Sequence, residues 1–368
     1  MKRFLLAFVL LATALAGCGG AAAPAASSPA AKPTTWDGLV AAAKKEGTVS
    51  VIVPPGDNIK AALVDAFEAK YPGIAVDALP SSGSAITSRV MSERGANKYL
   101  WDVFVNGITD LLTTFIPANA LEPIPPALML PEVTDPKNWR DGGIEYLDKD
   151  KMVLVTTRTV YPTLWVNPTM IKPDQITSYK DFLAPAWKGK FILDDPKKSG
   201  PGQALLTLWY LTPGLGPDFV KAIAAQQPLI LTDYTQEANM VGQGRYAALL
   251  GGSDQTLSRM VKEGLPIAVV PPEQLKEPVQ VAAGATGAAL FTHAPHPNAA
   301  KVYLNWLLSK DGQAAFAPTQ PAVSNRLDVP ATYLESWRVP VPGAIKTYGT
   351  DVLAVRDNVI ALAKEAFQ

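Results

Sequence analysis

The only cysteine of this 368-residue chain stands at the end of an N-terminal apolar run, and this position constrains the fold. Lys2 and Arg3 precede a run from Phe4 to Ala16 that is too short to span a bilayer as a stable helix. A basic start followed by a short apolar run is typical of a secretory signal peptide. Because Cys18 has no second cysteine to pair with, no disulfide within the chain can contribute to the fold.

The residues around Cys18 also predict where the protein resides. Leu15, Ala16 and Gly17 before the thiol resemble the bacterial lipobox, in which the cysteine is lipidated and becomes the mature N-terminus. We therefore expect residues 1–17 to be a lipoprotein signal peptide and Cys18 to be the lipidation site. The predicted location is the bacterial cell envelope, lipid-anchored on the periplasmic or extracellular face, and an ordinary secretory signal with a chance cysteine is the alternative.

The segment after the cysteine is predicted to be a tether. Residues 18–35 are almost entirely Gly, Ala, Pro, Ser and Thr, which bury too little apolar surface to offset the entropy of ordering. The remaining length exceeds what one hydrophobic core usually serves, so two lobes are expected. Removing Lys2 and Arg3 from the 33 basic residues leaves 31 against 33 acidic ones, a balance that argues against nucleic acid as a partner.

The rest of the chain alternates strand and helix patterns. Thr48 to Val53 is β-rich, and the segment 58–70 places Ile59, Leu63 and Phe67 at helical spacing. Two further strands and one helix are predicted at residues 74–79, 102–105 and 85–94. We therefore expect an α/β lobe with a largely parallel sheet flanked by helices.

A long β-rich segment from Met152 to Val166 has the length of a strand that passes between lobes. The alternation then resumes, with strands predicted at 191–193, 246–250, 267–270 and 288–291, and helices at 203–211 and 237–241. The last strands read as a return to the first lobe, so we predict two chain crossovers and an interlobe cleft at the carboxyl ends of the strands. The predicted boundaries are 36–157 with 270–325 for lobe I, and 158–269 with 326–368 for lobe II.

Several phrases in a fixed order carry a family resemblance. They are residues 36–39 and 42–47, 67–74, 165–168, 195–196 with 199–200, and 296–301 with 306–313. Together they resemble the type 2 periplasmic binding proteins of ABC importers, in particular the ferric-iron, phosphonate and thiamine binders. The resemblance implies a two-lobed α/β fold of the periplasmic-binding-protein type and a receptor that closes on a small-molecule ligand and docks on a membrane permease without catalysing a reaction. We also expect a monomer.

Two loops of small residues are expected to bind the ligand. Ser82, Gly83 and Ser84 lie between a predicted strand and helix, where hydroxyl and backbone N–H groups can hold an anion or polar oxygen. The family resemblance implies ligand binding by this loop, and simple capping by Ser84 is the alternative. Ser199 and Gly200 are the counterparts in the second lobe, with a tight turn as the alternative.

Four further residues are expected to face the cleft. Asn106 follows a predicted strand of lobe I, and Gly252 and Ser253 follow the last strand of lobe II, where backbone can approach a ligand closely. Arg158 on the crossover suits bidentate capture of a carboxylate or phosphonate. A strand alternates faces, so only one parity can point inward, and a solvated hinge charge is the alternative for Arg158.

The residues of these loops favour an anionic ligand. In the ferric-iron binders, two adjacent tyrosines near the position of Gly251 and Gly252 bind the metal, and this chain has neither. No metal and no other cofactor is predicted. The loops hold neutral donors and few carboxylates, so we predict a small organic anion bearing carboxylate, phosphonate or phosphate. A neutral polar solute is the next candidate, and a ferric-iron receptor of the same fold is the alternative function.

Two functions of other classes remain open. A lipid-anchored hydrolase needs a clustered acid, base and nucleophile, but His293 and His296 lack the spacing of a zinc motif and the chain has no Gly-x-Ser-x-Gly elbow. A sensor that reports ligand occupancy to a membrane kinase shares every feature described above. The prediction is a receptor and not an enzyme.

Overall fold

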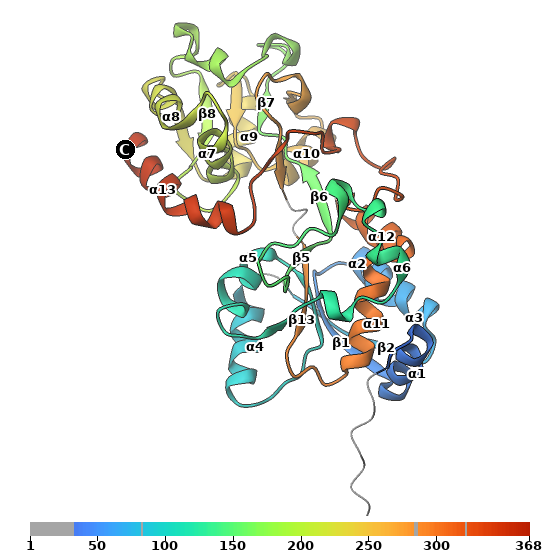
Figure 1. Cartoon of the computed structure of the whole chain (residues 1–368). Coiled ribbons are helices and arrows are strands. Elements are labelled where there is room, and N and C mark those ends of the chain that lie inside the picture. The colour runs from blue at the N-terminus through green and yellow to red at the C-terminus, as the bar shows by residue number, and fades with distance from the viewer. Residues whose placement is uncertain (1–32, 82–83, 283–285, 321) are drawn as a thin grey trace, which may run out of the picture.

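The computed structural model describes residues 33–81, 84–282, 286–320 and 322–368, and these form two α/β lobes joined by a small sheet (Figure 1). Cys18 and the predicted tether to residue 32 lie outside the described residues, as do Ser82 and Gly83. Among the described residues, no helix combines the length and apolar character needed to cross a membrane.

The sheet of lobe I has the order β2-β1-β3-β13-β4, with β5 paired to β13. The parallel neighbours of β1 are β2 and β3, whereas β13 runs antiparallel to β3, β4 and β5, so the sheet is mixed rather than largely parallel. Its strands are β1 (Thr48–Val53), β2 (Ala75–Pro80), β3 (Val103–Asn106), β4 (Leu121–Glu122), β5 (Leu154–Val155) and β13 (Gly287–Phe291).

Helices cover both faces of this sheet because its strands are apolar on both sides. Val51 of β1 packs with Phe67 and Trp306 on one face, and the next residue, Ile52, packs with Phe104 on the other. The helices of lobe I are α1 (Trp36–Glu46), α2 (Asp57–Lys60), α3 (Ala66–Lys70), α4 (Ser84–Gly95), α5 (Ile108–Asp110), α6 (Pro131–Thr134), α11 (Pro297–Leu308) and α12 (Lys310–Phe316), with π-helical turns η1 (Ala61–Asp65) and η2 (Leu111–Phe115).

Lobe II repeats this arrangement around a sheet of order β11-β7-β10-β8-β9. Leu193 packs with Trp209 on one face, and Ile192 packs with Leu257 on the other. The elements are β7 (Leu164–Val166), β8 (Phe191–Asp194), β9 (Leu229–Leu231), β10 (Ala248–Leu250), β11 (Ala268–Val269), α7 (Pro201–Leu211), α8 (Gly216–Ala225), α9 (Tyr234–Gly242) and α10 (Asp254–Lys262). Short 3-10 turns occupy 125–127, 136–138, 140–142, 173–175, 179–183, 185–187, 272–274, 317–319 and 336–338.

A third sheet joins the lobes, with the order β14-β6-β12-β15. Its strands are β6 (Thr157–Val160), β12 (Gln280–Ala282), β14 (Val323–Ser324) and β15 (Ile345–Lys346). The segment 152–166 was predicted as one long strand, and this is wrong. It is divided into β5, β6 and β7, which belong to three different sheets, and Pro162 lies in the break before β7 because proline cannot donate to a ladder.

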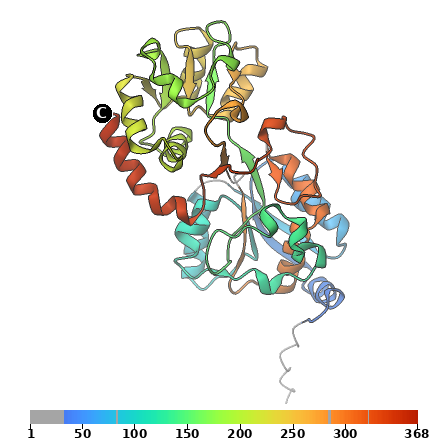
Figure 2. The same ribbon diagram turned by 45° about the horizontal axis from the view of Figure 1, so that its top comes forward.

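The C-terminal helix α13 (Thr350–Ala366) runs from the junction of the lobes along lobe II (Figure 2). Val359 and Leu362 join the lobe II core beside α7, whereas Leu353 in its first turn packs against the lobe I core. The segment predicted at 267–270 contains β11, which pairs with β7 inside the lobe II sheet, so it does not return to lobe I. The chain returns through β12 of the joining sheet to β13, the strand predicted at 288–291. The lobe boundaries given above stay a prediction.

Candidate functional site

A cavity of about 390 Å³ lies between the two lobes. Lobe I contributes the loop after β3 and the start of α5, lobe II contributes the first turns of α7, and the C-terminal segment contributes the start of α13. We call it the interlobe cavity, and its lining is Gly107, Ile108, Thr109, Leu112, Ser199, Gly200, Gln203, Ala204, Thr207, Ala282, Thr347, Tyr348, Gly349, Val352, Leu353 and Arg356. Its volume lies within the range of small-molecule sites.

Two residues predicted from the sequence, Ser199 and Gly200, line this cavity just before α7. A hydrogen bond to the end of β8 fixes this loop, because the N–H of Gly202 donates to Asp194 Oδ2 at 2.6 Å. A side chain at Gly202 would place its Cβ 2.1 Å from the backbone oxygen of Asp194, so only glycine fits. Pro201 has no N–H, and the start of α7 therefore keeps few donors for a ligand.

A buried pair of acids lies beneath this loop. Glu237 of α9 is fully buried, and neither of its carboxylate oxygens has a hydrogen-bonding donor among the described residues. Burial, and then the charge of Asp194, raise the pKa of Glu237 to about 9, and burial also raises the pKa of Asp194. We assign the proton to Glu237, since Asp194 already accepts the N–H of Gly202. The pair then carries one negative charge instead of two.

In lobe I, the predicted residue Asn106 ties two loops together. Its side-chain amide donates to the oxygen of Ser81 at 2.7 Å, and its Oδ1 accepts the N–H of Gly107 at 2.8 Å. Gly107, and not Asn106, lines the interlobe cavity. The predicted residue Ser84 begins α4.

The predicted lobe II residues Gly252 and Ser253 have structural contacts. A Cβ at Gly252 would lie 2.5 Å from a methyl of Leu249 and 2.7 Å from one of Leu257, so core packing explains the glycine. Ser253 caps α10 by accepting the N–H of Thr256 at 3.4 Å. Neither residue lines the interlobe cavity.

The C-terminal segment covers the next residue of that loop. Arg338 binds both carboxylate oxygens of Asp254, at 2.6 and 2.9 Å, and both side chains are buried. The N–H of Asp254 donates to the hydroxyl of Tyr161 at 3.2 Å. The charge of Asp254 is therefore matched within the protein.

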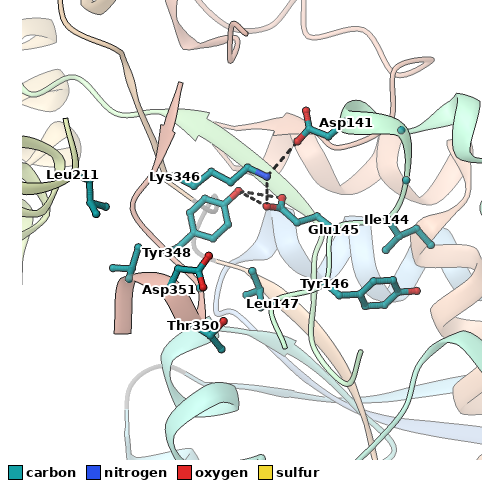
Figure 3. Close-up of a pocket in the computed structure, with 14 residues that line it drawn as sticks. Asp141, Ile144, Glu145, Tyr146, Leu147, Leu211, Lys346, Tyr348, Thr350 and Asp351 are labelled. Carbon is teal, nitrogen blue, oxygen red and sulfur yellow. Dashed lines mark hydrogen bonds and ion pairs between the residues drawn. The ribbon is translucent and has the colours of Figure 1, made fainter. Parts of the chain in front are cut away.

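Arg158 lies in a network of charges at the junction of the lobes. Its Nη1 is 2.8 Å from Asp141 Oδ2, and its Nη2 is 3.0 Å from Glu145 Oε2 without the alignment of a hydrogen bond. Lys346 contacts the same two carboxylates at 3.2 and 2.6 Å, and the hydroxyl of Tyr348 donates to Glu145 (Figure 3). We call these five residues the hinge network.

The hinge network and the interlobe cavity meet only at Tyr348. Arg158 alternates with Thr157 and Thr159 along β6 and shares its face with Val160, which packs against Val281 and partly buried Trp337. Arg158 is buried and does not line the cavity. Sequence reasoning missed this network, because the two acids lie at 141 and 145 whereas Lys346 lies 188 positions after Arg158.

Sequence reasoning also missed Arg356, the only charged residue among the described lining of the cavity. It is exposed on α13, and the one ion pair of this helix among the described residues joins Glu365 to Lys221. A single arginine in a C-terminal helix carries no motif. It becomes notable only once the fold brings α13 to the cavity.

The Asp102–His296 pair lies away from the interlobe cavity. His296 pairs with Asp102 at 2.9 Å, at the amino end of β3, whereas the interlobe cavity adjoins the carboxyl end of that strand. Within the described ranges, no group of three His, Cys, Asp or Glu side chains is arranged to hold a metal.

A comparison with protein families finds a match over most of the chain. A family model described as bacterial extracellular solute-binding protein matches residues 62–337. No curated protein matches the chain.

Solved structures are similar to this chain in fold. The IdiA (FutA) protein of Trichodesmium, in complex with iron and citrate, is 18% identical, with a TM-score of 0.64 over 87% of this chain and 99% of that one. The ferric iron-binding protein A of Mannheimia haemolytica, in an open conformation, is 16% identical, with a TM-score of 0.66 over 87% and 98%. AfuA of Actinobacillus pleuropneumoniae, with bound fructose-6-phosphate, is 15% identical, with a TM-score of 0.56 over 87% and 97%.

Proposed function

Because this chain belongs to the bacterial extracellular solute-binding protein family, we propose that its lobes close on a small organic anion and deliver it, as a lipid-anchored monomer, to an ABC permease. The family consists of receptors rather than enzymes. One observation carries the proposal, namely a cavity whose walls come from both lobes and from the segment between them. A ligand that contacts both walls stabilises the closed arrangement more than the open one.

The lining of the cavity supports an anion over a cation. The described lining residues include one arginine and no carboxylate. The similar structures contain iron with citrate in one case and a sugar phosphate in another. Organic anions are thus among the solutes that this fold accommodates.

Ferric iron is the second candidate, because several similar structures are those of iron-binding proteins. Tyr348 is the only tyrosine of the described lining, and its hydroxyl donates to Glu145 at 3.0 Å. Burial, and then the charge of Glu145, hold the pKa of Tyr348 far above its usual value. This tyrosine is therefore a poor source of the phenolate that ferric iron requires.

The test is a thermal-shift screen followed by small-angle scattering. The screen contains carboxylates, phosphonates, sugar phosphates, neutral sugars, polyamines and ferric citrate, because any solute that binds the native state raises the melting temperature. We expect an anion to do so and to reduce the radius of gyration at saturation. A saturating binder that leaves the scattering profile unchanged would contradict capture by closure.

A further inference from the structure

We infer that the ligand is an organic acid with an apolar body, and that Arg356 of α13 binds its acid group. This inference rests on the proposed function and deepens it, because it names the cation and the shape of the solute. The basic side chains nearest the cavity in the hinge network, Arg158 and Lys346, are already paired with Asp141 and Glu145. Arg356 lines the cavity without a carboxylate partner among the described residues.

The neutral polar groups of the cavity divide into committed and available ones. Thr207 donates to the oxygen of Gln203, Thr347 accepts from Gln280, and Tyr348 donates to Glu145. Three side chains make no hydrogen bond to another described residue, and they come from both lobes: Thr109, Ser199 and Gln203. Together with Arg356 they offer a cation and neutral donors, which suits an acid group with a further polar atom.

The apolar lining lies beside the arginine. Val352 and Leu353 precede Arg356 by four and three positions, so the three side chains share one face of α13. Ile108 and Leu112 of lobe I also line the cavity and belong to the same apolar cluster as Leu353. A solute with a carbon body next to its acid group buries that body here, which adds affinity in proportion to the area covered.

The position of α13 couples ligand binding at Arg356 to the arrangement of the two lobes. Leu353 packs on the lobe I core, while Val359 and Leu362 belong to the lobe II core, so the helix spans the junction (Figure 2). An acid bound at Arg356 with its body against Ile108 therefore links lobe I to the helix that lobe II holds. This linkage favours the closed form.

The experiment compares carboxylates with their neutral amides by calorimetry. The probes are acetate, butyrate, hexanoate and 2-hydroxyhexanoate, each with its amide. We expect affinity to rise with chain length and each amide to bind roughly tenfold or more weakly than its acid. Arg356→Gln should lower the affinity for the acids by a similar factor and leave that for the amides unchanged, and Arg356→Lys should recover part of the loss. The control Lys364→Gln removes an exposed cation of the same helix away from the cavity.

Three outcomes overturn the inference: acids that bind Arg356→Gln as tightly as the wild type, amides that match their acids, or no binding by any of the carboxylates. Scattering separates these failures from failure of the receptor function. If another solute of the screen contracts the wild-type protein, the receptor function stands and the acid-binding role of Arg356 falls. If no solute contracts it, both fall.

Discussion

Glu237 is the residue whose burial has the clearest measurable consequence. Its carboxyl has an ordinary pKa of 4.5, and the fold raises this pKa to about 9. The native state therefore keeps a proton that the unfolded chain releases above pH 4.5. The resulting stability is fully present below that pH and is lost as the pH rises toward 9, with a slope of at most about 1.4 kcal/mol per pH unit.

Glu237→Gln should flatten this pH dependence, because glutamine keeps the shape without a titrating proton. We expect the variant to be less sensitive than the wild type to a change from pH 6 to pH 9 in urea unfolding. Glu365→Gln is the matched control, since Glu365 is an exposed carboxylate. An equal pH slope in Glu237→Gln and the wild type would show that Glu237 is ionised in the fold.

Sequence reasoning placed correctly those residues whose position follows from the order of strands and helices along the chain. Ser199 and Gly200 precede a helix at a strand end, and such positions meet in the cleft of an α/β sheet. Gly252 was predicted to let the backbone approach a ligand closely. A glycine after a strand can also be required by packing or by a turn, and the sequence does not distinguish these causes. Only the packing of Leu249 and Leu257 identifies the cause here.

At the element scale, the junction between lobes depends on β6. Arg158 is 4% exposed, and it faces Glu145, itself largely buried, and the more exposed Asp141. A buried charge that loses its partner costs several kcal/mol, whereas a well-packed apolar replacement of the whole pair costs little.

Arg158→Met should destabilise the protein by about 2 kcal/mol, because Glu145 loses one of its two cations and keeps Lys346 and Tyr348 as partners. The double variant Arg158→Met with Glu145→Gln should regain much of that loss. Arg259→Gln breaks an exposed pair with Glu263 and should change stability by less than about 1 kcal/mol. Denaturant unfolding of the wild type, these three variants and the single variant Glu145→Gln measures the differences, and an additive double variant would mean that Arg158 and Glu145 are not coupled.

The elements of lobe I follow their local patterns closely. The strand predicted at 48–53 is β1, and the helix predicted at 85–94 lies within α4. The predicted helix at 58–70 contains the π-helical turn η1, which side-chain spacing alone cannot reveal. The division of 152–166 among three sheets was missed because a β-rich run does not record which partner each piece pairs with.

At the scale of the whole molecule, the two lobes and their interlobe arrangement were predictable, but the path of the C-terminal segment was not. Residues 326–349 contain few apolar repeats, and the contacts that attach them to the rest of the chain are long-range, such as Arg338 with Asp254 and Lys346 with Glu145. The path of such a segment depends on its contacts with distant parts of the chain and not on its own sequence pattern. For that reason the cation of the interlobe cavity lay beyond sequence reasoning.

The predicted membrane anchor determines how the whole molecule is held at the cell envelope. The described chain begins beside α1, which packs against α11 in lobe I. An anchor at Cys18 would therefore attach lobe I to the membrane through the predicted tether, and lobe II could still move toward lobe I. Cys18→Ala should move the protein from the membrane fraction to the soluble fraction of fractionated cells. The melting temperature and ligand affinity should not change, because the described residues of both lobes begin at position 33. Metabolic labelling with a fatty-acid analogue should mark the wild type and not the variant. Cys18→Ala protein that stays with the membranes, or a wild type that takes up no label, would refute lipid anchoring at Cys18 while leaving solute capture unaffected.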